Sequence, residues 1–198
     1  MDTKLIEQRL RWIVVGVTCF LVALILLNGG FFLKQVNYWW QQDVTGNGFE
    51  INDIAGESDR IAIPRIGVEA PLLYVDTVDE GRLQEALIDG VVHYWGTAMP
   101  GEYGNAYFFG HSSNFPTKPG EFKTVFALLT QLREGDEIMI TNHFGTKYTY
   151  RILDREIIKP NRTDVVSQGD SSKRILTLQT SYPLGLAIWR YIVIAEMI

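Results

Sequence analysis

Cysteine is almost missing from this sequence, in which Cys19 is the only one. The chain therefore forms no internal disulfide and no cysteine-based metal cluster. Cys19 lies inside an apolar run, so no cysteine outside that run can act as a nucleophile. Histidine is scarce as well, because His93, His111 and His143 are too far apart for a local metal-ligand pattern. These absences argue against a zinc enzyme.

Positive charge is also in short supply, since 18 Lys and Arg residues face 23 Asp and Glu residues, for a net charge of −5. An acidic chain has no electrostatic attraction for a phosphate backbone, so nucleic acid is not expected as a partner. Glu102, Asp136 and Glu137 could suggest a calcium site, but a scatter of carboxylates is typical of a solvated face. We therefore expect no metal and no cofactor.

Charged side chains are missing from residues 12–33. At a helical rise of about 1.5 Å per residue this run would span roughly 33 Å, so we expect a transmembrane helix over 12–34. Basic residues precede the run and only Lys34 follows it closely, so the positive-inside rule places residues 1–11 in the cytoplasm. The run is too long for a signal h-region and is apolar on all sides, which argues against a signal peptide and a core helix.

Residues 35–58 are expected to tether this helix to a folded domain that occupies 59–198. Apolar density falls after Gln41, where Gly, Asn, Asp and Glu dominate. Tyr38, Trp39 and Trp40 fit an aromatic belt at the membrane interface. The localisation predicted is therefore a single-pass cell-membrane protein with its folded domain outside the cytoplasm.

Short β-strands dominate the structure expected for 59–198. Residues 60–75 predict two strands broken by Pro64 and Gly67, and 136–140 with 147–153 predict a hairpin. Further strands are expected at 91–94, 106–109, 155–159, 175–181 and 189–194, and short helices at 80–87 and 125–132. Seven or eight short strands with small helices predict an all-β barrel or sandwich.

Three polar residues stand at the ends of these strands. Ser181 ends one strand and Arg190 begins the next, so a hydroxyl and a guanidinium could converge on one carbonyl group. His111 follows the buried strand 106–109 and Gly110, which puts an imidazole on the rim of the domain. Each also has an ordinary interpretation: a turn histidine, a loop-capping serine and a solvated strand arginine.

The chain resembles the sortase family over about residues 59–198. The likeness rests on Gly110-His111 after an apolar strand, on Thr177-Leu-Gln-Thr-Ser181 followed by Arg190, and on the N-terminal anchor. It also includes Phe122-Lys-Thr-Val-Phe126 and Gly135-Asp136-Glu-Ile. The segment from Gly96 to His111 is similar to the Gly-Thr-Ala-x-Pro-Gly-Glu…Gly-Asn…Gly-His pattern of class D/E-like sortases.

This resemblance implies a closed eight-stranded β-barrel and a membrane-anchored transpeptidase. Such an enzyme cleaves an LPxTG-like sorting signal at the C-terminus of secreted proteins, between Thr and Gly. It then transfers the acyl group to an amine acceptor on a cell-wall precursor or a protein subunit. By position His111 is the general acid and base, Arg190 binds the substrate carbonyl and oxyanion, Thr180 helps to hold that oxyanion, and Ser181 takes the nucleophile position.

Ser181 departs from the family, whose motif is Thr-Leu-x-Thr-Cys. A nearby cation can lower the pKa of a thiol until the thiolate is populated, but a serine hydroxyl is not ionised near neutral pH and needs a base. That base usually needs a third group to orient it, and no carboxylate in the sequence identifies itself as that group. Ser181 is then an engineered replacement, a natural inactive homologue or a working serine variant, favoured in that order. We expect an inactive or severely slowed enzyme.

Two rival interpretations remain open. The first is a noncatalytic, membrane-tethered peptide-binding module on the same barrel, with Arg190 holding a peptide carbonyl. The second is an unrelated extracellular β-barrel, which would place His111, Ser181 and Arg190 on different faces.

Overall fold

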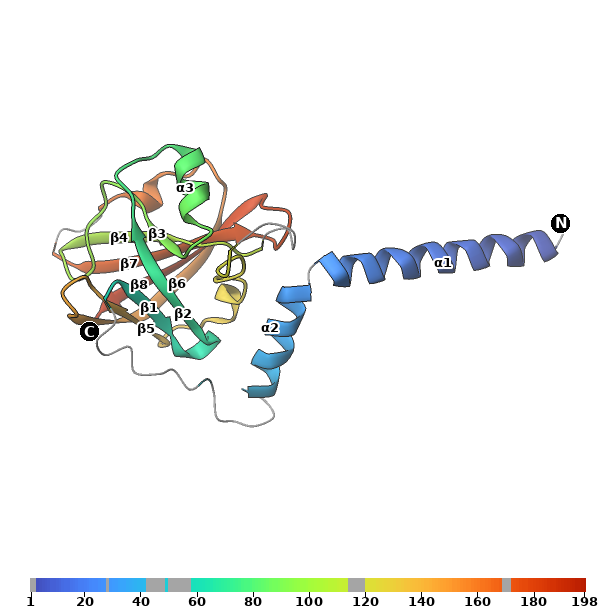
Figure 1. Ribbon diagram of the computed structural model, residues 1–198, viewed down its shortest axis with the longest axis horizontal. Helices are drawn as coiled ribbons and strands as arrows, with labels where there is room; N and C mark the ends of the chain where they lie inside the picture. Colours follow the sequence, from blue (N-terminus) through green and yellow to red (C-terminus); the bar gives the residue numbers. More distant parts are fainter. Residues whose placement is uncertain (1–2, 28, 42–48, 50–57, 114–119, 169–171) are drawn as a thin grey trace.

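Eight strands close into a barrel in the computed structural model, which describes residues 3–27, 29–41, 49, 58–113, 120–168 and 172–198 (Figure 1). Their order around the barrel is β1-β2-β3-β4-β7-β8-β6-β5. The strands are β1 (Arg60–Ile63), β2 (Val68–Tyr74), β3 (Val91–His93), β4 (Gly104–Phe109), β5 (Glu137–Thr141), β6 (Lys147–Ile158), β7 (Arg174–Tyr182) and β8 (Trp189–Met197). This closure confirms the predicted eight-stranded barrel and excludes a sandwich.

Two of the strand pairs are parallel, β2 with β3 and β4 with β7, and the others are antiparallel. Because parallel neighbours run in the same direction, the carboxyl ends of β4 and β7 meet at one rim of the barrel. The register pairs Phe109 with Gln179, so the chain leaves both strands side by side. This pairing brings together two segments that lie 70 residues apart in the sequence.

Apolar side chains of every strand fill the barrel. Ile61, Phe108, Ile138 and Leu178 are completely buried, as the inward half of a period-two pattern requires. Burying one such side chain stabilises the fold by about 1.5–3 kcal/mol relative to exposing it. The barrel interior is therefore a packed core, which leaves binding to its rims.

The turns lie where proline, glycine and asparagine in the sequence predict them. Pro64 starts the 3-10 turn η2 (Pro64–Ile66), and Gly67 ends it with a φ of 61° that favours glycine. The β5–β6 hairpin closes through hydrogen bonds between the amide of Asn142 and the carbonyl of Thr146 and between the amide of Gly145 and the carbonyl of Asn142. Both predictions are confirmed.

Helix α3 (Glu80–Ala86) is also confirmed, and the Asp79 carboxylate caps it by accepting a hydrogen bond from the amide of Arg82. The helix expected at 125–132 is wrong, since this segment forms successive turns and the 3-10 turn η3 (Leu129–Gln131). The amide of Phe126 donates to the carbonyl of His111 at 2.9 Å instead of to a helical partner. Contact with the barrel therefore overrides the apolar periodicity. A third 3-10 turn, η4 (Asp164–Val166), lies between β6 and β7.

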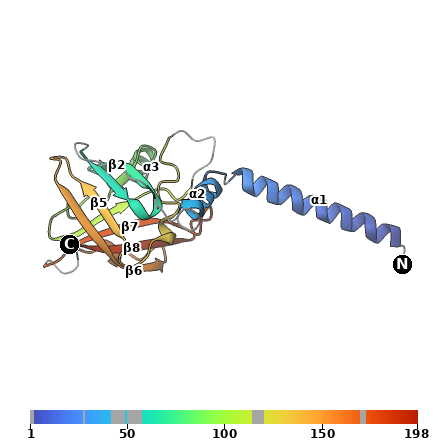
Figure 2. The same ribbon diagram turned by 90° about the horizontal axis from the view of Figure 1, so that it is seen from below.

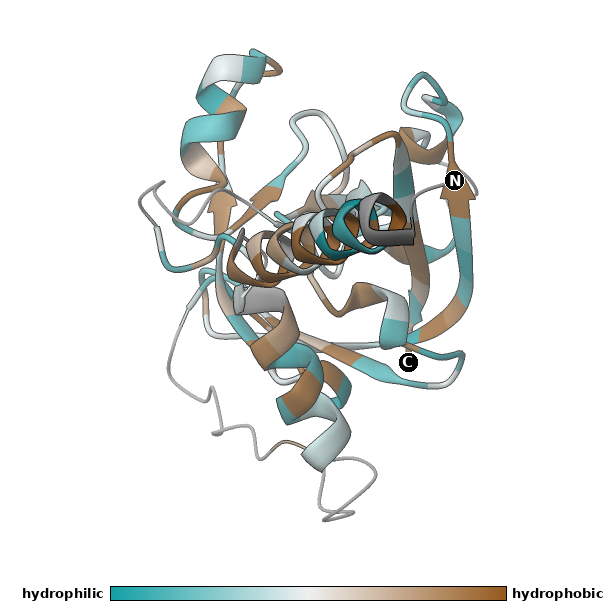
Figure 3. Ribbon diagram, turned by 90° about the vertical axis from the view of Figure 1, so that its right-hand side faces the viewer, coloured by the Kyte–Doolittle hydropathy of each residue, from teal (hydrophilic) through white to brown (hydrophobic). Residues whose placement is uncertain are grey.

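Two helices occupy the N-terminal region, α1 (Thr3–Leu27) and α2 (Gly29–Trp39), where one helix was expected over 12–34. Glycine is a poor helix former, and Gly29-Gly30 accounts for the end of the first helix. Within the described ranges, no helix combines the length and the apolarity that crossing a membrane requires. The transmembrane helix therefore stays a prediction. Figures 1 and 2 show α1 extending away from the barrel, and Figure 3, which looks along α1, shows hydrophilic residues near its N-terminus and hydrophobic residues farther along.

Helix α2 packs against the barrel. The ammonium group of Lys34 donates to the carbonyl of Thr124 at 2.7 Å, and Tyr38 is buried with the barrel core. The guanidinium of Arg65 lies 5.8 Å from the centre of the Tyr38 ring. The structure thus corrects two expectations: Tyr38 belongs to the core and not to an interfacial belt, and residues 35–39 are helix instead of tether. The rest of the expected tether, at 42–48 and 50–57, lies outside the described residues.

Candidate active site

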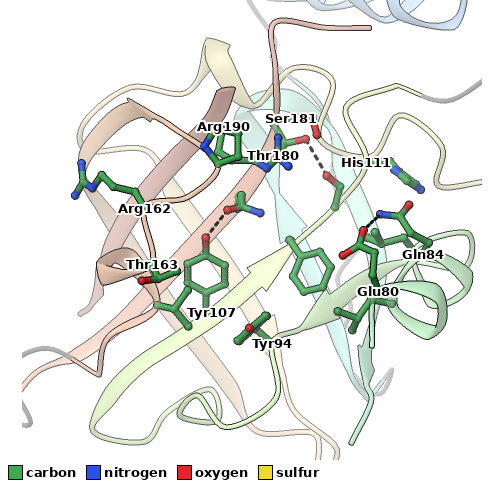
Figure 4. A pocket seen from close by; sticks show the side chains of 17 residues that line it. Glu80, Gln84, Tyr94, Tyr107, His111, Arg162, Thr163, Thr180, Ser181 and Arg190 are labelled. Atoms are coloured by element: carbon green, nitrogen blue, oxygen red, sulfur yellow. Dashed lines mark hydrogen bonds between the residues drawn. The ribbon is translucent and has the colours of Figure 1, made fainter. Parts of the chain in front are cut away.

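A cleft of about 290 Å³ opens at the rim where β4 and β7 end (Figure 4). The structure brings all four predicted site residues into it. They are His111 after β4, Thr180 and Ser181 on β7, and Arg190 on β8. Placement of these side chains on different faces, as an unrelated barrel would have it, is therefore wrong.

Ser181 and Arg190 are direct partners in the antiparallel β7–β8 ladder. Such cross-strand neighbours have Cβ atoms about 4.5–5.5 Å apart, so both side chains project from the same place on the sheet. The Arg190 Nη1 atom donates to the carbonyls of Ala187 and Trp189, each at 3.1 Å. The β7–β8 loop thus holds the guanidinium at the cleft, and no other described residue accepts a hydrogen bond from it.

His111 lies two residues beyond the end of β4, just past Phe109 and Gln179, the last paired residues of β4 and β7. In Figure 4 Ser181 is seen between Arg190 on one side and His111 on the other. Burial lowers the pKa of His111, so the imidazole is neutral at pH 7. A neutral imidazole is the form that accepts a proton as a general base.

Gly110 allows the chain to pass closely beneath the cleft. A Cβ atom at this position would lie 2.7 Å from the Phe126 ring and 2.9 Å from Val125. The Gly110 amide donates to the carbonyl of Gln179, and its carbonyl accepts from the Thr180 hydroxyl at 2.8 Å. Packing therefore requires a glycine at position 110. Its close approach to Phe126 and its two hydrogen bonds to β7 fix where the next residue, His111, begins.

Thr180 is buried, and its hydroxyl proton is already used in the bond to Gly110. In this arrangement the hydroxyl cannot also donate to an oxyanion, since it carries one proton. Its observed role is to join the ends of β4 and β7. The oxyanion role of Thr180 stays a prediction.

The side wall of the cleft is the segment 160–168 between β6 and β7, which contributes Pro160, Arg162, Thr163 and Val166. Asn105 holds this wall: its Nδ2 donates to the carbonyls of Val165 at 2.9 Å and Ser167 at 3.3 Å. Its Oδ1 accepts from the Thr177 hydroxyl at 2.7 Å. The side-chain oxygen of Gln168 in turn accepts from the amide of Asn105. Asn105 is therefore the anchor of the wall.

Arg162 in this wall is fully engaged with carboxylates. It contacts Glu156 at 2.9 Å and Asp164 at 2.7 Å, and its hydrogen bond to Asp164 holds the pKa of that carboxyl below its usual value. On the floor of the cleft the Tyr107 hydroxyl donates to the side-chain oxygen of Gln179 at 2.6 Å. Burial raises the pKa of Tyr107 well above its usual value, so the phenol stays protonated.

Sequence reasoning missed most of this lining. The missed polar residues come from α3, from the end of β3, from β4, from the wall and from β7: Glu80, Gln84, Tyr94, Tyr107, Arg162, Thr163 and Gln179. Gln179 lies inside the Thr177–Ser181 motif, which was a usable signal. The others carry no spacing pattern, because only the barrel topology brings them together.

The other two histidines lie outside the cleft. His93 is buried, with Nε2 at 2.9 Å from both the Ala98 carbonyl and the Thr97 hydroxyl. Burial lowers the pKa of His93, against the opposing effect of the bond to Ala98. His143 lies in the β5–β6 turn, with Nδ1 at 2.9 Å from an oxygen of Asp59. Among the described residues, neither histidine lines the cleft.

Residues 61–198 match the family model of the sortase domain. The chain therefore belongs to the sortase family, which confirms the resemblance in the sequence and excludes an unrelated barrel. It is 28% identical over 141 residues to sortase D of Bacillus subtilis (strain 168), over 70% of this chain and 62% of that protein.

Solved sortase structures are similar in fold. Sortase C-1 from Actinomyces oris superposes with a TM-score of 0.59 at 28% identity, over 70% of this chain and 72% of that chain. The sortase D5 transpeptidase of Clostridium perfringens superposes with a TM-score of 0.57 at 31% identity, over 70% of this chain and 77% of that chain.

Proposed function

We propose that this protein is a sortase-type transpeptidase whose active site is the cleft at His111, Ser181 and Arg190. Its first substrate is a secreted protein that carries an LPxTG-like sorting signal, and its second is an amine on a cell-wall precursor or a protein subunit. The observation that carries the proposal is the meeting of the three side chains in one cleft, with Ser181 directly opposite Arg190. Sortase family membership supplies the reaction class.

The reaction begins with the Ser181 oxygen attacking the carbonyl carbon of the scissile peptide bond. The neutral His111 ring takes the hydroxyl proton, and Arg190 stabilises the negative charge that develops on the carbonyl oxygen. Collapse of the intermediate breaks the C–N bond, and His111 returns the proton to the leaving amine. An acceptor amine then attacks the resulting ester and loses a proton to His111, and the C–O bond to Ser181 breaks as His111 passes that proton to the Ser181 oxygen.

Serine slows the first of these steps. The hydroxyl must lose its proton during attack, whereas a thiol beside a cation is already partly ionised. Sortases are generally cysteine transpeptidases, so Ser181 is the residue expected to limit this chain. We therefore expect slow or undetectable turnover, with substrate binding intact.

The proposal includes a membrane setting, with residues 1–11 in the cytoplasm and the barrel outside. Its support is the uncharged run at 12–33 and the exposure of apolar side chains along α1, among them Trp12, Phe20 and Leu26. Carbonate extraction of membranes, followed by protease treatment of intact cells, tests this part separately. Release of the chain into the soluble fraction would reject it.

The test of the enzymatic proposal is to place the thiol at position 181. Ser181→Cys should release transpeptidation of a sorting-signal peptide onto an amine, measured by mass spectrometry of the joined product. His111→Ala in the same background should abolish it. A matched control is His143→Ala, which changes an exposed histidine outside the cleft and should leave turnover unchanged.

A noncatalytic peptide-binding module is the second candidate, favoured by the missing thiol itself. Both candidates predict that the unsubstituted chain binds a sorting-signal peptide. They differ in the Ser181→Cys protein: binding without any joined product would favour the module and reject the enzyme.

A further inference from the structure

We propose that Gln84, held in place by Glu80, is a positioning residue that orients the imidazole of His111. This inference rests on the proposed function, in which His111 is the general base. It supplies the third group that serine chemistry needs and that no pattern in the sequence identified.

Helix α3 forms one wall of the cleft, with Glu80, Leu83, Gln84 and Leu87 all lining it. Leu83 and Leu87 are buried and pack with Val92, which fixes the rotation of the helix. Glu80 and Gln84 are separated by four positions, so their side chains project from one face of α3. The packing of two leucines thus aims this pair at the rim where His111 lies.

The orientation of the Gln84 amide follows from its bond to Glu80. The Nε2 atom of Gln84 donates to a carboxylate oxygen of Glu80 at 2.8 Å. An ionised carboxylate only accepts hydrogen bonds, so the NH₂ group must face Glu80 and the amide oxygen must face away. Figure 4 shows the Gln84 amide between the Glu80 carboxylate and the His111 ring. In that view the amide oxygen faces the His111 ring, with which it makes no hydrogen bond in this structure.

His111 is suited to such an acceptor. Its ring makes no hydrogen bond to any of the described residues, although its backbone is fixed through Phe126. A neutral imidazole has one N–H group and one free lone pair. An acceptor for the N–H group selects the tautomer and leaves the other nitrogen free to take the proton of Ser181.

The charges around the cleft agree with this arrangement. Among the described residues that line it, Glu80 is the only carboxylate, and Arg162 and Arg190 are the fixed cations. Arg162 is paired with Glu156 and Asp164, whereas Glu80 bonds to Gln84. The carboxylate that lines the cleft is therefore bonded to a neutral amide, and among the described residues it makes no ion pair with His111.

The test is NMR of the full chain with ¹⁵N-labelled histidine, with Ser181 in place and no substrate added. One tautomer of His111 should dominate in the unsubstituted chain. Gln84→Ala should shift the two ring nitrogen signals toward the mixed-tautomer values of a free imidazole. Gln84→Glu places a carboxylate at the same distance along the helix and should raise the pKa of His111. An unchanged tautomer ratio in Gln84→Ala would overturn the proposal.

The matched control is Glu85→Ala, which changes an exposed residue of the same helix that does not line the cleft. It should leave the His111 signals as they are; a tautomer shift equal to that of Gln84→Ala would also reject the proposal. In the Ser181→Cys background Gln84→Ala should lower kcat about tenfold with KM unchanged, since a misaligned base loses part of the 10²–10⁴-fold that such catalysis provides. No turnover from Ser181→Cys would reject the proposed function, while the NMR result would still decide the role of Gln84.

Discussion

Ser181 on β7 and Arg190 on β8 are opposite each other in the antiparallel ladder, one pair before it ends at Tyr182 and Trp189. Backbone hydrogen bonding therefore sets the spacing of their Cα atoms. The direction of the guanidinium is set differently, through its bonds to the Ala187 and Trp189 carbonyls. The positive charge of Arg190 and the orientation of its guanidinium are thus separate properties, which different substitutions can distinguish.

Arg190→Lys should keep the positive charge and lose the fixed orientation of the cationic group. Lysine lacks the planar guanidinium, which is held through Nη1 to the Ala187 and Trp189 carbonyls while its other nitrogens stay available to substrate. In the Ser181→Cys background kcat should therefore fall by about 10–100-fold. Arg190→Ala should cost about 10²–10³-fold, the usual effect of removing one oxyanion donor. Steady-state kinetics with a sorting-signal peptide measures both. Equal activity of the Lys and Arg proteins would show that charge alone is sufficient.

Asn105→Ala should loosen the cleft wall. The change removes two bonds to 165 and 167 and leaves the Thr177 hydroxyl without its acceptor, a loss of about 2–4 kcal/mol in the free energy of unfolding. Hydrogen exchange at 160–168 should rise, as should the Kd for a sorting-signal peptide. Asn142→Ala in the β5–β6 turn is the control and should change neither the hydrogen exchange at 160–168 nor the Kd. If Asn105→Ala left the Kd unchanged, the wall would have no role in peptide binding.

Gly110→Ala should destabilise the domain and displace His111. The new methyl group would lie 2.7 Å from the Phe126 ring, and overpacking of this kind costs about 1–3 kcal/mol. Urea unfolding measures the stability, and a crystal structure of the variant would locate the ring. Gly16→Ala is the control, because nothing lies within 4 Å of a Cβ atom there. Barrel stability unaffected by Gly110→Ala would contradict the close approach.

Stability should fall as the pH drops from about 7.5 to 5.5. Burial lowers the pKa of both His111 and His93, so the unfolded chain takes up protons first as the pH falls through the ordinary histidine value of about 6.5. Proton uptake by the unfolded chain favours unfolding. Urea unfolding at several pH values measures the slope, which should become smaller in His111→Gln and in His93→Gln. A stability that rises on acidification over this range would refute the assignment.

Tyr38 and Trp39 are neighbours on α2 with opposite expected effects. Tyr38 is buried with the barrel core, so Tyr38→Ala should lower the free energy of unfolding by about 2–4 kcal/mol. Trp39 is 53% exposed, and Trp39→Ala should stay within about 0.5 kcal/mol. Denaturation of the full chain in detergent compares them. Equal effects would mean that α2 does not dock as described.

Much of the barrel could be predicted because its strands carry local signals. Pro64 and Gly67 marked the break between β1 and β2, and alternation with a turn marked the β5–β6 hairpin. The helix predicted at 125–132 was wrong because Val125, Leu128 and Leu132 are buried without forming one. The backbone there bonds instead to the carbonyl of His111, through the amide of Phe126. The periodicity of apolar residues predicts which side chains are buried, but it does not predict which groups the backbone amides bond to.

The candidate site was predictable where one motif contained it and not elsewhere. Ser181 and Arg190 lie on consecutive strands, and the family resemblance added His111. Glu80 lines the cleft from a helix and Arg162 from the connection 160–168, which Asn105 on β4 holds through its bonds to Val165 and Ser167. Such long-range geometry leaves no trace in residue spacing.

Closure of the barrel has a consequence for how any peptide is recognised. Each of the eight strands has a neighbour on both sides, so along the paired lengths the sheet offers no edge to which a peptide could add as another strand, and only strand ends such as 180–182 extend past a neighbour. The affinity for a peptide must then come from individual contacts with side chains and loop carbonyls at the rim. Substrate choice can then change through the connections 160–168 and 183–188 while the hydrogen-bonded wall of the barrel stays the same.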